Sequence, residues 1–253
     1  MRALILAAGV GHRLAPLTDQ KPKCLLPVGG RSLLERMLES LAAVPVREAV
    51  IVVGHCQEQV RRVAGSRFGR LPVRYIENPE YTRDSIRSLW VCRDELDEDS
   101  IVMDADVLFP TAFLRSLLAG PDPSALLIDR GFTDTGEEVK VYARAKQALA
   151  VGKKVLEPPP HDMVGEAIGF FKCAAAHGPV LRECMEEVLR DQSRYREYED
   201  AIDLLLRRVP VGWVDTGGLP WTEIDFAEDL RRAEAEVLPL IQHLGDPRQG
   251  LRR

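Results

Sequence analysis

Short apolar runs alternate with amphipathic segments along most of the chain. Runs of four or five apolar residues, rich in Val and Ile, are typical of strands that are buried on both faces of a sheet. Between these runs, apolar residues recur every three or four positions, which predicts helices with one buried face. The alternation therefore predicts an α/β fold in which helices flank a mixed, mostly parallel sheet. The predicted strands are Leu4–Ala8, Ala49–Val53, Val73–Glu77, Ser100–Met103, Ala125–Ile128 and Val139–Ala143.

The helical segments carry their own start signals. Ser32 precedes a segment with helical spacing and is a natural N-cap, and Pro110 suits the first turn of another helix. Three consecutive prolines at positions 158–160 predict a rigid surface loop. We therefore expect one domain over residues 1–253, with a C-terminal tail over residues 236–253. The predicted helices are Ser32–Leu41, Gln57–Ala64, Ser85–Glu95, Pro110–Leu118, Pro179–Asp191, Glu199–Arg207 and Phe226–Val237.

Composition and charge narrow the class of partner. The chain has 253 residues, of which 45% are hydrophobic and 29% charged, and these values are typical of a soluble globular protein. A net charge of −5 argues against a nucleic acid or an anionic membrane as partner. No apolar stretch approaches the roughly 20 residues that span a bilayer, and the N-terminus lacks a signal-peptide pattern. Five widely spaced cysteines predict reduced thiols in a cytoplasmic protein.

The first 28 residues carry the most specific chemical signal. They read MRALILAAGVGHRLAPLTDQKPKCLLPV, so that an apolar strand leads into a loop with Gly9 and Gly11. Glycines at the end of a strand let backbone N–H groups approach a phosphate closely. Arg13 and Lys23 add the cations that such a loop needs to bind a polyphosphate.

Other nucleotide-binding loops fit this sequence poorly. A dinucleotide-binding loop requires a third Gly or Ala where Leu14 stands, and its second strand should end in an acidic residue, whereas this one ends in Gly54. No GxxxxGK[ST] string is present, which excludes a Walker A loop. An ordinary strand-turn would explain the glycines alone, but not Arg13 and Lys23 in register with them.

The segment resembles the nucleoside-triphosphate signature of the sugar-phosphate nucleotidyltransferases, AAGxGxRxxPxTxxxPKxLLPV. His12 departs from it, because the family usually has a small hydroxyl residue there. The resemblance implies a Rossmann-like, three-layer (GT-A-like) nucleotidyltransferase fold with a small acceptor-binding subregion. It also implies that Arg13 and Lys23 are catalytic. The nucleotide would be bound by Leu6, Ala7, Ala8, Gly9, Gly11, Arg13, Lys23, Gly54, Ser85 and Asp104.

Two carboxylates are candidates for the Mg²⁺ that nucleotidyl transfer needs. Asp106 follows a buried strand, and the carboxyl ends of strands face the ligand crevice of an open α/β sheet. Asp104 points to the same face if the strand continues. Asp225 precedes a predicted helix and could simply stabilise its N-terminus. The family pattern instead implies that Asp106 and Asp225 are the metal ligands.

Further segments resemble one branch, the bacterial phosphocholine cytidylyltransferases and their relatives. WTEIDFAEDL, from Trp221 to Leu230, is similar to the WxEIDxxxDL segment of this branch. NPEYTRDSIRSLW is similar to NxxYxxTNNxxSLW, with Asp84 and Ser85 in place of two asparagines. Those two departures leave simple phosphocholine specificity open. The resemblance runs from Met1 to about Ala233 and implies a mainly nucleotide-binding half (1–110) and a mainly acceptor-binding half (111–235). Its acceptor site would include Asp84, Lys140, Glu166, Tyr198 and Asp200. Trp213 is added by residue type, because aromatic faces hold a choline-type ammonium.

The branch implies transfer of CMP from CTP to a small phosphorylated alcohol or phosphonate. Phosphocholine, inositol phosphate and aminoethylphosphonate are acceptors of this type, and Asp84 would suit an acceptor with an amine. A sugar-1-phosphate nucleotidylyltransferase that uses UTP, dTTP or GTP is the first alternative. A non-catalytic nucleotide-binding regulator on the same fold is the second. The sequence leaves the acceptor, the base and a homodimeric state open.

Overall fold

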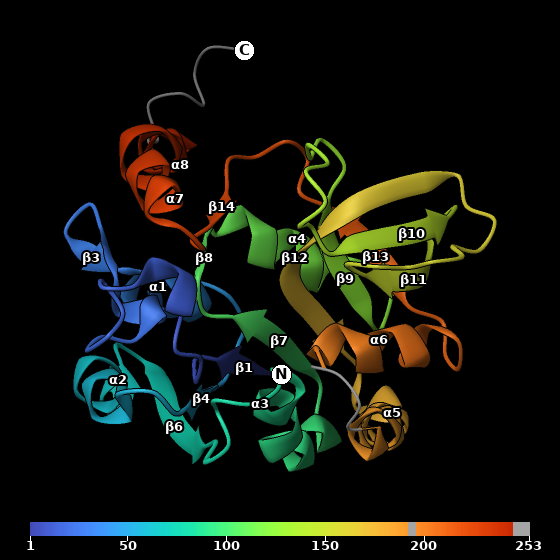
Figure 1. Ribbon diagram of the computed structural model, residues 1–253, viewed down its shortest axis with the longest axis horizontal. Coiled ribbons are helices and arrows are strands. Elements are labelled where there is room, and N and C mark those ends of the chain that lie inside the picture. The colour runs from blue at the N-terminus through green and yellow to red at the C-terminus, as the bar shows by residue number, and fades with distance from the viewer. Residues whose placement is uncertain (192–195, 245–253) are drawn as a thin grey trace.

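A ten-stranded mixed sheet runs through the centre of the described part of the chain (Figure 1). The structure is a computed structural model that describes residues 1–191 and 196–244. In spatial order the strands are β10 (Lys140–Arg144), β11 (Gln147–Gly152), β13 (Gly212–Asp215), β9 (Ala125–Asp129), β12 (Met163–Cys173), β7 (Ser100–Asp104), β1 (Arg2–Leu6), β4 (Ala49–Val53), β6 (Leu71–Glu77) and β5 (Arg67–Phe68). Two small ribbons pair β2 (Pro27–Val28) with β3 (Arg31–Ser32) and β8 (Val107–Leu108) with β14 (Thr222–Glu223).

The two halves of the sheet differ in strand direction. Strands β7, β1, β4 and β6 are parallel, so their carboxyl ends lie at one edge of the sheet. Strand β12 is antiparallel to both β7 and β9 and joins this half to the other. The prediction of a mixed α/β sheet is confirmed, with most of the parallel pairing in the N-terminal half.

Helices cover both faces of the sheet, which confirms the three-layer arrangement. Helices α1, α2 and α4 pack their apolar residues on one face, and α3, α5 and α6 pack theirs on the other. The helices are α1 (Leu33–Ala42), α2 (Gln57–Ala64), α3 (Ile86–Val91), α4 (Ala112–Ala119), α5 (Gly178–Arg190), α6 (Tyr198–Leu206), α7 (Ala227–Arg232) and α8 (Leu238–Leu244).

Local signals account for the helix that begins after the signature loop. Ser32 is the N-cap of α1, as predicted, and its hydroxyl accepts a hydrogen bond from the backbone N–H of Glu35. The Glu35 carboxylate in turn accepts one from the backbone N–H of Ser32 at 2.8 Å. This reciprocal capping box satisfies two N–H groups that a helix start otherwise leaves unpaired.

Three expectations need correction. The helix predicted over Ser85–Glu95 ends at Val91 and continues as a 3₁₀ turn, Arg93–Asp97. The helix predicted over Phe226–Val237 consists of α7 and a π turn that leads into α8. The pattern also gave no sign of β11, β12, β13 or β14 as strands. Part of the predicted tail is helical, and residues 245–253 lie outside the described residues.

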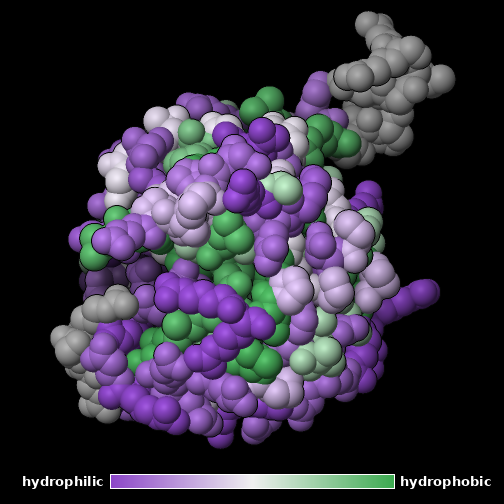
Figure 2. Space-filling model, turned by 90° about the vertical axis from the view of Figure 1, so that its right-hand side faces the viewer, coloured by the Kyte–Doolittle hydropathy of each residue, from purple (hydrophilic) through white to green (hydrophobic). Residues whose placement is uncertain are grey.

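The C-terminal helices return to the N-terminal half. Ala233, Val237 and Leu238 pack with Leu14 and Val28 in a separate apolar cluster. The last described helices therefore cover the signature loop, although they lie more than 200 residues away in sequence. On the face shown in Figure 2, hydrophilic side chains form most of the surface and apolar ones lie in hollows between them.

Candidate active site

The signature loop forms a tight turn after β1. Gly11 has a φ of 70°, a left-handed conformation that favours glycine, and it leads into a 3₁₀ turn that carries Arg13. The Thr18 hydroxyl donates a hydrogen bond to the Gly11 carbonyl at 2.8 Å and holds the loop in place. Ala7 and Ala8 are buried beneath the loop, whereas Gly9 is exposed. This arrangement leaves the backbone at Gly9 accessible to a ligand.

The end of β4 lies against the same loop. A Cβ atom on Gly54 would lie 2.6 Å from the Cβ of Tyr81 and 2.9 Å from the Ala8 carbonyl oxygen. The His55 backbone N–H donates to that same Ala8 carbonyl at 3.1 Å. Glycine is therefore required at position 54 for the two strand ends to approach this closely. The structure places Gly54 directly beside the predicted nucleotide loop.

Three carboxylates converge beyond the end of β7. Asp106, Glu223 and Asp225, here called the carboxylate cluster, each offer an oxygen atom within 4.8 Å of the others. The β8–β14 ribbon brings them together, because Glu223 lies opposite Val107 in the pairing. The Ile224 backbone N–H also donates to the Asp106 carbonyl at 3.1 Å. The predicted metal ligands Asp106 and Asp225 are thus neighbours.

Both signature cations reach this cluster. The Lys23 ammonium lies 2.6 Å from Asp106 Oδ2, 2.5 Å from Asp225 Oδ1 and 4.0 Å from Glu223 Oε1. The Arg13 guanidinium lies 2.7 Å from Asp225 Oδ2. Burial alone would lower the pKa of Lys23, but the three carboxylates around it raise the pKa above its ordinary value. Lys23 is therefore a permanent cation at this site.

The donor set suits a hard divalent cation. All three side chains offer oxygen, and Mg²⁺ prefers oxygen ligands. One oxygen of Asp106, Oδ1, is buried and has no hydrogen-bond partner, so this carboxylate has an acceptor atom that no protein donor satisfies. Desolvation by burial is the main cause that raises the pKa of Glu223 to about 8, and the charges of Asp106 and Asp225 add to it. The three carboxylates also outnumber the two cations in contact with them. A divalent ion would remove this excess of negative charge.

Asp104 takes part in a separate contact beside the cluster. The Tyr198 hydroxyl donates to Asp104 Oδ2 at 2.6 Å, and the Tyr198 backbone N–H donates to the Ser85 hydroxyl at 3.2 Å. Burial, with a contribution from the charge of Asp106, raises the pKa of Asp104 well above its ordinary value. The structure therefore joins two predicted nucleotide-binding residues, Ser85 and Asp104, through a predicted acceptor-binding residue.

Two predicted acceptor residues make structural contacts. Asp84 Oδ1 accepts a hydrogen bond from the Arg196 backbone N–H at 3.1 Å. Asp200 Oδ2 accepts one from the Glu197 backbone N–H at 3.1 Å and completes a capping box at the start of α6. Both carboxylates therefore hold the segment that enters α6, whatever else they bind.

The other predicted acceptor residues lie in two separate parts of the sheet. Lys140 and Glu166 lie opposite each other on β10 and β12, and Lys140 forms an ion pair with Asp134 at 2.7 Å. Trp213 instead donates to the Ala145 carbonyl at 3.1 Å, in the turn beyond the other end of β10. Five strand residues span about 16 Å. The structure therefore brings Lys140 and Glu166 together and leaves Trp213 apart from them.

Burial and neighbouring carboxylates give Glu166 an unusual environment. Burial is the main cause that raises its pKa to about 7, and the charges of Glu138 and Asp129 add to it. Asp129 lies opposite Glu166 in the β9–β12 pairing and accepts a hydrogen bond from Trp221 Nε1 at 2.8 Å. Trp221 immediately precedes β14, so its hydrogen bond with Asp129 connects the surroundings of Glu166 to the segment that carries Glu223 and Asp225.

Sequence reasoning missed Glu223 and Lys153. Glu223 stands two positions before Asp225, and this spacing in a strand was the signal that both side chains share a face. Lys153 follows β11 and pairs with Glu197 at 3.4 Å. Burial opposes its charge, but Glu197 raises the pKa of Lys153, and the charges of Arg13 and Glu223 also act on it. Lys153 therefore brings a cation toward the cluster from the C-terminal half.

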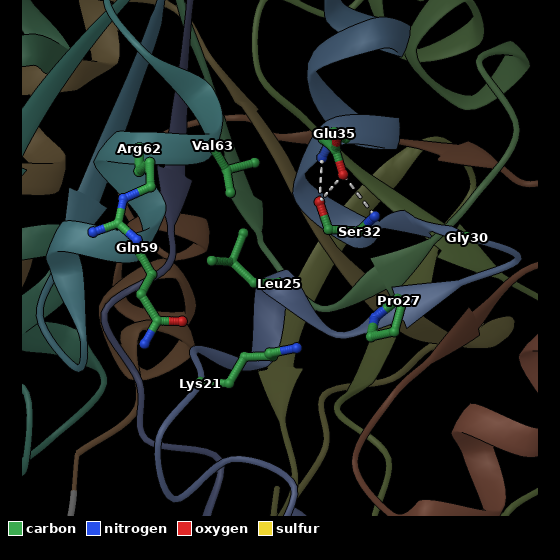
Figure 3. A pocket seen from close by; sticks show the side chains of 9 residues that line it. All are labelled: Lys21, Leu25, Pro27, Gly30, Ser32, Glu35, Gln59, Arg62 and Val63. Carbon is green, nitrogen blue, oxygen red and sulfur yellow. Dashed lines mark hydrogen bonds between the residues drawn. The ribbon is translucent and has the colours of Figure 1, made fainter.

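A hollow on the outer side of the signature loop is distinct from this site. It has a volume of about 330 Å³ and lies between α1 and α2 (Figure 3). Ser32 and Glu35, which are joined by the capping hydrogen bonds of α1, are among the residues that line it. None of the predicted site residues lines this hollow. Its lining residues are Lys21, Leu25, Pro27, Gly30, Ser32, Glu35, Gln59, Arg62 and Val63.

Comparison with known proteins identifies the family. Residues 3–151 match the model of the MobA-like NTP transferase domain. The chain belongs to this family of nucleotidyltransferases. Family membership confirms the resemblance that the signature loop carried. In the described part of this NTP transferase, no helix has the length and apolar character needed to cross a membrane.

Two curated relatives align with nearly the whole NTP transferase chain. It is 41% identical over 251 residues to the CMP-5'-(3-aminopropyl)phosphonate synthase of Streptomyces rubellomurinus, covering 94% of this chain but 39% of the relative. It is 36% identical over 248 residues to the choline-phosphate cytidylyltransferase of Streptococcus pneumoniae, covering 94% of this chain and 98% of the relative. The chain thus spans well under half the length of the first relative.

Solved structures agree on the fold. The CTP:phosphocholine cytidylyltransferase from Streptococcus pneumoniae superposes with a TM-score of 0.75 at 22% identity, covering 92% of this chain and 97% of that one. The similarity confirms the Rossmann-like nucleotidyltransferase fold. At this level of identity the superposition supports the fold alone.

Proposed function

We propose that this NTP transferase is a Mg²⁺-dependent cytidylyltransferase that acts on a small phosphorylated alcohol or phosphonate. The observation that carries the proposal is the carboxylate cluster with Lys23 and Arg13 in contact with it. Transfer between two polyanions requires positive charge at the reacting phosphates, and this site combines two cations with carboxylates that could hold a divalent ion. The names of its two relatives support CTP as donor, one being a CMP-phosphonate synthase and the other a cytidylyltransferase.

The proposed reaction is a direct displacement at the α-phosphorus of CTP. An acceptor oxygen forms the new P–O bond while the bond to the β-phosphate breaks and pyrophosphate leaves. Arg13 holds the leaving phosphates, and Lys23 neutralises charge on the α-phosphoryl oxygens. Magnesium held by Asp106 and Asp225 would supply the charge that offsets repulsion between the two anions. No general base is needed, because a phosphate monoester is already anionic near neutral pH.

We place the acceptor on the side of the cluster formed by β11, β12 and α6. Lys153 would provide a cation there for the acceptor's phosphate or phosphonate, because the charges of Arg13 and Glu223 act on it and its pairing with Glu197, at 3.4 Å, is longer than that of Lys140 with Asp134. Glu166, whose side chain has no hydrogen bond or ion pair among residues 1–191 and 196–244, would attract an ammonium group. Asp84 suits this role less, because Arg87 lies 3.7 Å away. An acceptor that carries both a phosphonate and an amine would therefore pair with both Lys153 and Glu166.

Pyrophosphate release tests the proposal. CTP, UTP, dTTP, ATP and GTP are each assayed with Mg²⁺ against aminopropylphosphonate, aminoethylphosphonate, phosphocholine, inositol phosphate and glucose-1-phosphate. We expect turnover with CTP and an amine-bearing phosphonate. A preference for UTP or dTTP with glucose-1-phosphate would replace the proposal with a sugar-phosphate nucleotidylyltransferase. Nucleotide binding without any release would instead indicate the regulator.

We further propose that the protein works in the cytoplasm. All five cysteines are free thiols, four of them buried. Unpaired cysteines are usual in a reducing compartment.

A further inference from the structure

The Lys23 ammonium uses the same oxygen atoms that a metal ion would use. It lies 2.6 Å from Asp106 Oδ2 and 2.5 Å from Asp225 Oδ1, and those two side chains are the proposed metal ligands. Mg²⁺ binds carboxylate oxygens at about 2.0–2.1 Å, so the ion and the ammonium would compete for nearly one position. Their like charges would also repel strongly at such a separation. The two cations therefore exclude each other from the cluster.

Arg13 strengthens this competition. Its guanidinium occupies Asp225 Oδ2 at 2.7 Å, while Lys23 occupies Oδ1, so both oxygens of Asp225 are paired with a cation. Oδ1 of Asp106 is the oxygen in the cluster that is buried without a hydrogen-bond partner. A metal ion that arrives alone must therefore displace two charge-assisted contacts before it gains Asp225.

The Lys23 side chain also lies close to the signature loop. Its stem packs beside the signature loop, because a Cβ atom on Gly11 would lie 3.3 Å from Lys23 Cβ and 3.5 Å from Lys23 Cδ. A rotation of the outer side chain can therefore move the ammonium from the carboxylates toward the backbone at Gly9 and Gly11. Phosphates held by that loop would attract both Lys23 and Arg13 away from Asp225.

We propose that Lys23, with help from Arg13, is an internal counter-cation that keeps the metal position closed until a triphosphate binds. The triphosphate draws both cations onto its own oxygens and frees Asp106 and Asp225 for the metal. Metal and triphosphate therefore bind with strong positive coupling, and each raises the affinity for the other by the same factor. The inference rests on the proposed function in taking a nucleoside triphosphate as the ligand and Asp106 and Asp225 as the metal ligands.

The test measures Mn²⁺ binding to the protein without nucleotide, by electron paramagnetic resonance. Lys23→Met removes the competing charge and keeps most of the stem, so we expect it to bind Mn²⁺ roughly tenfold more tightly or better than wild type. Arg13→Met should act in the same direction but less, because Arg13 forms its ion pair in the cluster with Asp225, whereas Lys23 contacts both proposed metal ligands. Lys21→Met is the matched control, since Lys21 is exposed and two positions away. It should leave Mn²⁺ affinity unchanged.

A second measurement repeats the titration with CTP present. CTP should raise the Mn²⁺ affinity of wild type, and this coupling should shrink markedly in Lys23→Met. Unchanged or weaker Mn²⁺ binding by Lys23→Met without nucleotide would overturn the inference, and Arg13→Met decides the matter if Lys23→Met does not fold. If another triphosphate couples to Mn²⁺ and CTP does not, the inference stands and the assignment of CTP fails.

Discussion

At the scale of single residues, the site depends on how three carboxylates are neutralised. Lys23 and Arg13 supply two positive charges, and the remaining carboxylate, Glu223, responds with a pKa raised to about 8 by desolvation and by its acidic neighbours. The same imbalance that makes these side chains unfavourable for folding makes them favourable for a divalent ion. The charge balance of the carboxylate cluster therefore decides whether the site can hold a divalent ion.

Asp106→Asn should abolish most activity and keep the fold. The amide is nearly isosteric but loses the charge that would hold the metal, so pyrophosphate release should fall on the order of 1,000-fold. Circular dichroism and thermal unfolding check that the fold is retained. Glu39→Gln, which removes an exposed carboxylate paired only with Arg31, should keep wild-type activity. An Asp106→Asn enzyme with full Mg²⁺-dependent turnover would exclude Asp106 as a ligand.

Glu166 should make folding stability depend on pH. Its folded pKa of about 7, raised mainly by burial, lies above the ordinary value of 4.5, so the folded state holds a proton that the unfolded state has lost. Stability contributed by this group is then present below pH 4.5 and is lost as pH rises through about 7. Glu166→Gln should therefore gain stability relative to wild type between pH 5 and about pH 8.

Chemical denaturation at several pH values measures this difference. The comparison of Glu166→Gln with wild type isolates Glu166 from other titrating groups. A difference between the two proteins that is constant from pH 5 to about pH 8 would contradict the assignment. In turnover assays, Glu166→Gln should also raise the KM for an amine-bearing acceptor more than the KM for CTP.

The residues that sequence reasoning found are those tied to a motif. Arg13 and Lys23 stand at defined spacings in the signature after the first strand, and Asp106 follows the end of a buried strand. Sequence position and residue type together therefore predicted that they belong to the site. Glu223 escaped notice although it stands two positions before Asp225, and Lys153 escaped notice because only tertiary contacts bring it toward the cluster. Trp213 illustrates the opposite case: its residue type suggested an acceptor site, and the structure places it beside the turn at Ala145.

At the scale of elements, an irregularity in β12 lies directly against Asp104, beside the candidate active site. The register between β12 and β9 shifts between Ala167 and Phe171, and Gly169 has a φ of 75°. A Cβ atom on Gly169 would lie 2.3 Å from Asp104 Oδ2. The irregularity thus makes room for the Asp104 carboxylate that Tyr198 contacts.

Gly169→Ala should disturb both stability and activity. The left-handed backbone and the contact with Asp104 each oppose a methyl group, so we expect a loss of about 1–3 kcal/mol in the free energy of unfolding. Denaturant titration measures the loss. Gly131→Ala is the control, since Gly131 has no positive φ and its Cβ would lie 3.4 Å from the nearest atom. Equal stability of the two variants would show that the bulge tolerates a side chain.

Helices and strands with a strong local hydrophobic pattern were predictable from the sequence. Strands that form only because they pair with another strand were not. Strand β4 and helix α2 have the predicted bounds, because one is continuously apolar and the other has a clear helical period. Strand β12 escaped because Gly165 and Gly169 interrupt its apolar pattern. Strand β14 has two residues and owes its existence to pairing with β8.

At the scale of the whole molecule, the site joins the two ends of the described chain. Arg13 and Lys23 come from the first turn after β1, and Asp225 comes from the ribbon that precedes α7. A ligand bound to both would therefore link Lys23 and Asp225, which lie 202 positions apart in the sequence. Binding should stabilise the molecule as a unit.

Mg²⁺ and CTP together should raise the thermal midpoint more than the sum of their separate effects. Ligand at about 100 times its Kd adds roughly 2.7 kcal/mol to the free energy of unfolding. Differential scanning fluorimetry with each ligand alone and with both measures the increments. Asp225→Asn should lose the extra increment, because it removes the carboxylate that both signature cations and the metal share. Additive increments in wild type would argue against a shared site.

The β8–β14 ribbon also has a consequence for how the protein is made. During synthesis the signature loop and Asp106 leave the ribosome more than 100 residues before Glu223 and Asp225. Since chains fold from the N-terminus as they emerge, the parallel half of the sheet can form around a loop that still lacks its acidic partners. The ability to hold a metal would thus appear only when the C-terminal segment docks, which makes metal binding a late marker of complete assembly.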